Sequence, residues 1–132
     1  MVKNGRIVDG SGTDSYAGDV AVKSGRIVAV GAIDGDAREM IDADGRAVTP
    51  GFVDVHTHYD AQVFWDPLLT SSCWHGAFAS FEERVKGSIT PGKLADLVVL
   101  GEDPTQVDPD SLIKIPVEKT MVDGKFVWDQ EA

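Results

Sequence analysis

The chain has a single cysteine, Cys73, among its 132 residues, so it cannot form an internal disulfide bond. A chain without disulfides is typical of a reducing compartment, and the sequence therefore favours the cytoplasm. The sequence also lacks any apolar run approaching the roughly 18–20 residues of a membrane span, and "MVKNGRIVDG" lacks the apolar core of a signal peptide. These absences argue against a disulfide-stapled secreted domain and against a membrane protein.

Basic residues are scarce, since 12 Lys and Arg stand against 22 Asp and Glu, for a net charge of −10. Nucleic acids are excluded as partners because binding phosphates requires a patch of Lys and Arg. The acidic residues are scattered rather than gathered in a tail, which favours a solvated surface over an acidic binding site. A length of 132 residues suits one domain.

A short phrase recurs along the chain as "NGRIV", "SGRIV", "DGRAV" and "DGKFV". Gly5, Gly25 and Gly45, in the first three copies, are evenly spaced. Asn-Gly and Asp-Gly supply the positive φ angles of tight hairpin turns, and the β-branched residues that follow suit strands. The pattern predicts reused hairpins in an all-β sandwich or partial barrel. A solenoid is the competing explanation, but the repeated phrase is too short for one.

The C-terminal part of the chain is also rich in strand signals. "GSITPGKLADLVVLGEDP" places an apolar strand over Leu97–Leu100 between two turns, and "SLIKIPVEKTMVDGKFVWD" predicts two strands around Asp123-Gly124. Both ends of the chain are therefore β, and we expect them to pair with each other. The middle, residues 59–87, is aromatic and has no clean period of two or of 3.6. We expect it to be irregular or partly helical.

The stretch "TPGFVDVHTHYDA" combines a short apolar strand with two histidines, His56 and His58. Side chains alternate along a strand, so the two imidazoles face the same way with roughly 6.6 Å of rise between them. A pair so placed can share a divalent ion such as zinc. Asp54 and Asp60 have the same parity and are candidate third ligands. The alternative is two hydrogen-bonded histidines at a strand end, and a His-x-His motif alone does not decide between them.

Two longer stretches, "VTPGFVDVHTHYDAQVFWDPLLTSSCWHG" and "GSITPGKLADLVVL", resemble enzymes of the amidohydrolase superfamily, most of all its N-acyl-D-amino-acid deacylase branch. In that family the first stretch begins a metal-dependent (β/α)8 barrel, and the second returns the chain to a small β-sandwich. The N-terminal "NGRIVDG" and "GDVAVKSGRIVAVG" resemble the first half of that sandwich. The resemblance implies that His56 and His58 are the first pair of ligands to zinc or another divalent metal.

The resemblance also implies ligands from later barrel strands: a carboxylated lysine or its replacement, further histidines, and an aspartate that acts as general base. The chain has three histidines in all, fewer than such a site requires. His75 and Cys73 do not stand where the family places ligands. Lys86 and Asp96 lie in "ASFEERVKGSITPGKLADLVVL", the returning stretch together with the residues that lead into it. A barrel takes about 250 residues, but almost nothing separates the two resembling stretches, which join after Gly76. We therefore expect the barrel to be almost entirely missing.

The sequence thus predicts a mainly β fold, in which residues 1–51 and 87–132 form the two halves of a composite β-sandwich. Residues 52–86 are a remnant of the barrel start and its junction, with one orphan strand over Phe52–Val55, and the whole is one structural domain. The apolar segment 52–81 predicts a homo-oligomer, or else a region 60–80 without fixed structure, with repacking onto the sandwich as the alternative.

For function, the sequence favours an amidohydrolase-like protein without catalysis of its own, which binds a divalent metal weakly or serves as an oligomeric β-sandwich module. The incomplete site argues against a small-molecule substrate. The alternative is a metal-dependent hydrolase of C–N bonds, such as those of N-acyl-D-amino acids, completed by oligomerisation or by another chain.

Overall fold

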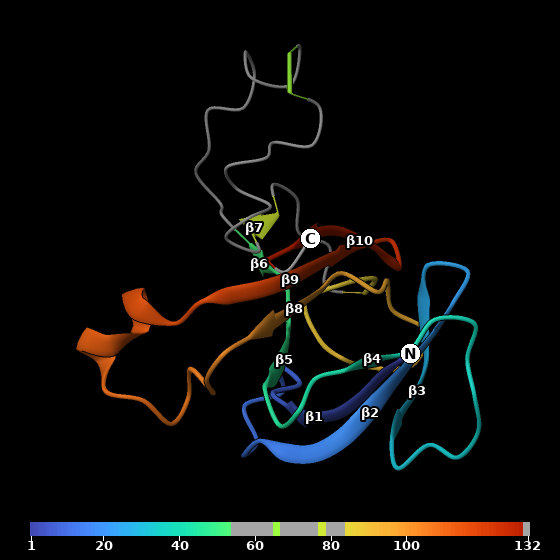
Figure 1. The fold of residues 1–132 in the computed structure, drawn as a ribbon, viewed down its shortest axis with the longest axis horizontal. Helices are drawn as coiled ribbons and strands as arrows, with labels where there is room; N and C mark the ends of the chain where they lie inside the picture. Colours follow the sequence, from blue (N-terminus) through green and yellow to red (C-terminus); the bar gives the residue numbers. More distant parts are fainter. Residues whose placement is uncertain (54–64, 67–76, 79–83, 131–132) are drawn as a thin grey trace.

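The computed structural model describes residues 1–53, 65–66, 77–78 and 84–130 (Figure 1). The predicted mainly β fold is confirmed, since strands dominate these residues and the helix among them is one short 3-10 turn. The elements are β1 (Val2–Ile7), β2 (Tyr16–Lys23), β3 (Arg26–Gly31), β4 (Ile41–Asp42), β5 (Ala47–Pro50), β6 (Phe52–Val53), β7 (Ala77–Phe78), β8 (Leu97–Leu100), η1 (Pro109–Lys114), β9 (Val117–Val122) and β10 (Lys125–Asp129).

Eight of the strands form one continuous sheet in the order β10-β9-β8-β5-β1-β2-β3, with β4 paired to β1 beside this path. The junction between the two ends of the chain is the antiparallel pair β5–β8, which runs in register from Ala47 opposite Leu100 to Pro50 opposite Leu97. The expected pairing of the N-terminal and C-terminal β segments is therefore confirmed. The two halves of the predicted sandwich are two regions of a single sheet.

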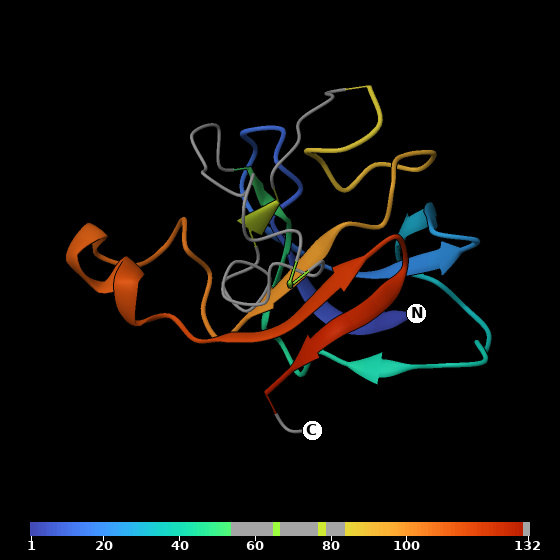
Figure 2. The ribbon, with the colours of Figure 1, turned by 90° about the horizontal axis from the view of Figure 1, so that it is seen from above.

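The two ends of this sheet fold over and touch at their hairpin tips, which lie side by side in Figures 1 and 2. The Ala95 N–H donates to the Gly25 carbonyl at 2.8 Å, and the Gly124 N–H donates to the Ala95 carbonyl at 3.1 Å. A Cβ atom on Gly124 would lie 3.0 Å from the Cα of Gly25. The two turns can approach this closely because both carry glycine.

Two of the four glycine turns are the hairpins that the sequence predicts. Ser24 and Gly25 join β2 to β3 with φ angles of 50° and 75°, and Asp123 and Gly124 join β9 to β10 with 47° and 74°. Positive φ at both central residues is the signature of the turn type that matches strand twist.

At the other two copies of the phrase, the prediction of a hairpin is wrong. Asn4 has a φ of 55°, but Asn4-Gly5 lies inside β1, where it makes a register irregularity opposite β2. The Asn4 N–H donates to Asp19 Oδ1 at 2.9 Å, so a tertiary contact holds this conformation within the strand. Asp44-Gly45 is a turn, but β4 and β5 on either side of it both pair with β1 in parallel, so it is not a hairpin.

The main core lies inside the folded sheet and draws on both ends of the chain. Its buried members are Val2, Ile7, Val20, Ile27, Ala43, Val48, Ile89, Ala95, Leu97, Val99 and Met121. A smaller cluster of Ala47, Val98 and Leu100 lies on the other face of β5 and β8. Because side chains alternate across a strand, β8 contributes to both clusters, and all four of its residues are buried.

The short strand β6 leaves this sheet and pairs in parallel with β7, with Phe52 opposite Ala77 and Val53 opposite Phe78. The predicted strand over Phe52–Val55 is thus a strand in its described part, Phe52–Val53. Most of the predicted irregular or helical middle lies outside the described residues. No helix within the described ranges is long and apolar enough to cross a membrane.

Candidate functional site

The candidate metal motif begins directly after β6, and the main sheet anchors the chain just before β6. β5 lies between β8 and β1 in the sheet, and the Gly51 N–H, just beyond it, donates to the Asp96 carbonyl at 3.0 Å. β6 then covers Phe52–Val53. The predicted ligands are Asp54, His56, His58 and Asp60. They lie outside the described residues, as do Cys73 and His75.

Lys86 and Asp96, the lysine and aspartate of the returning stretch, lie together. Lys86 Nζ is 3.3 Å from Asp96 Oδ2, and their side chains are only 18% and 7% exposed. The other carboxylate oxygen, Asp96 Oδ1, accepts the Asp123 N–H at 2.9 Å. The Asp96 carbonyl accepts the Gly51 N–H. Asp96 therefore joins the end of β5, the returning segment that carries Lys86 and the β9–β10 hairpin. Its contacts are those of a structural residue.

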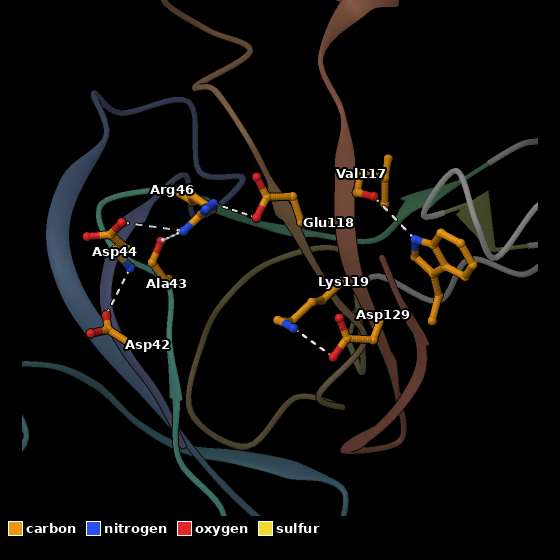
Figure 3. A network of polar contacts seen from close by, with 9 residues as sticks. Asp42, Ala43, Asp44, Arg46, Val117, Glu118, Lys119 and Asp129 are labelled. Atoms are coloured by element: carbon orange, nitrogen blue, oxygen red, sulfur yellow. Dashed lines mark hydrogen bonds and ion pairs between the residues drawn. The ribbon is translucent and has the colours of Figure 1, made fainter. Parts of the chain in front are cut away.

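A second polar network joins the two halves of the sheet (Figure 3). Arg46, just before β5, forms an ion pair with Glu118 of β9, and its guanidinium is also 3.7 Å from Asp44 Oδ2. On the neighbouring strands, Lys119 Nζ donates to Asp129 Oδ2 at 2.7 Å. Arg46, Glu118 and Lys119 line a cavity of about 410 Å³. Each cation faces a carboxylate there, and the Arg46–Glu118 pair joins the two halves.

A third set of polar contacts, around Asp19, holds the loop after β3 against the sheet. Asp19 accepts hydrogen bonds from Lys3 Nζ at 2.9 Å and from the Asn4 and Ile33 N–H groups at 2.9 and 3.2 Å. Burial acts to raise the pKa of Asp19, but these hydrogen bonds and the Lys3 charge outweigh it and hold the pKa below its ordinary value. The pKa of Asp103 is lowered in the same way: burial opposes the shift, and hydrogen bonds from Ser15 and Thr105 overcome it.

These lowered pKa values predict that the protein loses stability in acid. An unfolded Asp titrates near pKa 3.9, so around that pH the unfolded chain binds more protons than the folded one. The stabilisation is fully present above about pH 5 and is lost as the pH falls through the folded pKa. We expect Asp19→Asn to cost about 1–2 kcal/mol at neutral pH, since Lys3 keeps partial access to water.

Urea unfolding between pH 7 and pH 3 measures this effect. The free energy of unfolding should fall less steeply with acid for Asp19→Asn than for the wild type. Parallel curves would show that the Asp19 contacts do not couple folding to pH.

Metal-ligating groups do not cluster elsewhere in the described part of the chain. Within those residues no three or more His, Cys, Asp or Glu side chains are placed to hold an ion. Among the same residues, every buried side-chain nitrogen and oxygen has a hydrogen-bond partner. Sequence reasoning missed the Arg46–Glu118 network and the Lys3–Asp19 pair, because no local pattern links residues so far apart along the chain. For Lys86 and Asp96, the signal available was that both lie in the returning stretch.

The chain matches the model of the amidohydrolase family over residues 39–73 and 74–128. It therefore belongs to that family. The solved structures that it resembles include those of D-aminoacylase. The two matched segments adjoin at residues 73 and 74, close to the join after Gly76 that the sequence indicates.

The crystal structure of D-aminoacylase is 35% identical, with a TM-score of 0.55 over 58% of this chain and 16% of that one. The N-acyl-D-glutamate deacylase of Bordetella bronchiseptica is 40% identical, with a TM-score of 0.48 over 50% of this chain and 14% of that one. YtcJ, an amidohydrolase candidate of Bacillus subtilis (strain 168), is 34% identical over 50 residues, which is 38% of this chain and 10% of that protein. The chain thus spans less than a fifth of each of these relatives.

Proposed function

We propose that this chain is the β-rich part of a D-aminoacylase-like amidohydrolase, that it binds a divalent metal weakly through His56 and His58, and that it has no catalysis of its own. The observation that carries the proposal is the position of the motif, which begins directly after β6, and Gly51 just before β6 is anchored to the Asp96 carbonyl. A ligand pair that follows shortly after a point of the backbone anchored by the main sheet is the arrangement that favours a fixed metal position.

The donor set fits zinc or another divalent metal. Two imidazoles, with Asp54 and Asp60 as candidate third ligands, are nitrogen and oxygen donors of the kinds that zinc accepts. The similar D-aminoacylase has a binuclear metal centre, which supports a metal site in this family member. When bound, such a metal polarises a carbonyl or activates a water molecule. This chain would supply an incomplete ligand set, so we expect low occupancy.

Calorimetric titration with zinc tests this proposal. We expect binding in the micromolar range or weaker, with a stoichiometry near one ion per chain, and we expect His56→Ala to abolish it. The matched control is His75→Ala, which removes the histidine outside the motif and should leave the affinity unchanged. Equal losses in the two variants, or no binding by the wild type at millimolar zinc, would contradict the proposal.

The second candidate function is a hydrolase of C–N bonds, such as those of N-acyl-D-amino acids, that is completed by oligomerisation or by another chain. The structural likeness to D-aminoacylase supports it. Metal catalysis requires an open coordination position, a general base and a shaped cavity, and the chain's three histidines would have to be supplemented from outside. We also propose that the chain forms a homo-oligomer through residues 52–81. We further propose a cytoplasmic location, which the single cysteine favours.

A further inference from the structure

Two stretches of the chain share one sheet and one core. We call residues 1–53 the N-terminal segment and residues 84–130 the C-terminal segment; in Figure 1 they supply the blue-to-green and the gold-to-red strands of the same sheet. The N-terminal segment gives the main core Val2, Ile7, Val20, Ile27, Ala43 and Val48, and the C-terminal segment gives it Ile89, Ala95, Leu97, Val99 and Met121. Both segments therefore contribute to the burial of apolar surface.

The central contact between the segments is the β5–β8 pair. Ala47, Val48 and Thr49 of β5 are at most 3% exposed, and every residue of β8 is buried. Separating the segments would leave each of these strands with an unpaired edge and would expose their apolar side chains to water. The pair thus stabilises both segments at once.

Further contacts between the segments lie far from this pair. The Ile27 N–H donates to the Lys93 carbonyl at 2.9 Å, and the Ile27 carbonyl accepts the Gly92 N–H at 2.8 Å. The Ile89 N–H donates to the Asp9 carbonyl at 2.9 Å, and the Ile89 side chain is only 3% exposed. With the Arg46–Glu118 ion pair, these contacts reach from residue 89 to residue 118 of the C-terminal segment.

We propose that the two segments are complementary binding partners, that each folds by binding the other, and that the covalent connection between them is not required. A segment of about 50 residues buries too small a share of its surface to be more than marginally stable alone. The surface that each segment presents in the shared sheet is therefore a binding site for the other segment. This inference goes beyond the proposed metal-binding function and does not involve the histidines.

The connection contributes mainly a high local concentration of one segment at the other, in the millimolar range for a flexible connection. Cutting it should leave the fold in place and make its stability depend on protein concentration. For a domain of ordinary stability, a millimolar effective concentration predicts that the cut segments bind with a dissociation constant of about 1 µM or tighter.

Cleavage of the folded chain tests the proposal. A protease site flanked by glycine and serine is inserted between residues 73 and 74, where the two family-matched segments adjoin, and a chelator is present so that metal plays no part. At concentrations well above 1 µM, roughly the expected dissociation constant, the two pieces should elute together in gel filtration and keep the circular dichroism of the uncut chain. On dilution, the urea midpoint should fall more steeply for the cut chain than for the uncut chain, which is the reference at each concentration.

A matched pair of variants tests the part played by the shared core. In the cut chain, Ile89→Ala should raise the dissociation constant at least about tenfold, because a buried side chain of the shared core is lost. Ile113→Ala is the control in the same segment, since Ile113 is 91% exposed, and it should leave the dissociation constant unchanged.

Pieces that separate, precipitate or lose their circular dichroism after cleavage would overturn the proposal. So would a cut chain that does not regain its fold when it is diluted from urea, because the connection would then be required for folding. Equal effects of Ile89→Ala and Ile113→Ala would show that the shared core does not hold the segments together.

Discussion

Ile7→Ala is expected to lower the free energy of unfolding by about 3–4 kcal/mol. Ile7 is fully buried at the end of β1, which pairs with β2 on one side and with β5 on the other. Truncation removes its buried apolar surface and leaves a cavity that the surrounding strands can fill only in part. Such a loss is a large fraction of the total stability of a domain, which is typically about 5–15 kcal/mol. Urea denaturation followed by circular dichroism measures it.

The control for this prediction uses the same residue type in the opposite environment. Ile113 is 91% exposed, so Ile113→Ala should change the free energy of unfolding by no more than about 0.5 kcal/mol at low protein concentration. If the two variants lost similar stability, the core would not lie inside the folded sheet as described.

Asp96→Ala is expected to cost about 3 kcal/mol, because it removes one partner of a largely buried ion pair and an acceptor from a backbone N–H. Asp96 faces Lys86 Nζ with one oxygen and the Asp123 N–H with the other. Asp96→Asn keeps an oxygen for the N–H and loses only the ion pair, so it should cost about half as much.

Asp34 is an exposed aspartate, and Asp34→Ala serves as the matched control for the lost carboxylate. We expect it to change stability by no more than about 0.5 kcal/mol. An Asp96→Ala variant as stable as Asp34→Ala would show that Asp96 does not join the end of β5, the returning segment and the β9–β10 hairpin.

Much of the β structure could be predicted from the sequence, because it rests on local signals. Ser24-Gly25 and Asp123-Gly124 turn where the backbone needs positive φ, and Leu97–Leu100 is the buried strand that its composition predicts. Asn4-Gly5 carries the same signal and is part of a strand. There, the Asp19 side chain binds the Asn4 N–H, and a Cβ on Gly5 would lie 2.7 Å from Val48. Tertiary contacts from distant strands overrode the local preference.

The residues of the candidate site could also be predicted only in part. His56 and His58 could be named from their spacing and from the family motif around them. The Arg46–Glu118 pair could not, because it depends on β5 and β9 lying on the two sides of β8.

We propose above all that this chain carries a metal-ligand pair of the amidohydrolase family and lacks the means to use it alone. The most direct test is a deacylation assay of the zinc-saturated chain against N-acyl-D-amino acids, at several protein concentrations. We expect a rate no higher than that of the same buffer with zinc and no protein. A rate that grows with protein concentration and is abolished by His58→Ala would contradict it, and would favour the hydrolase completed by association.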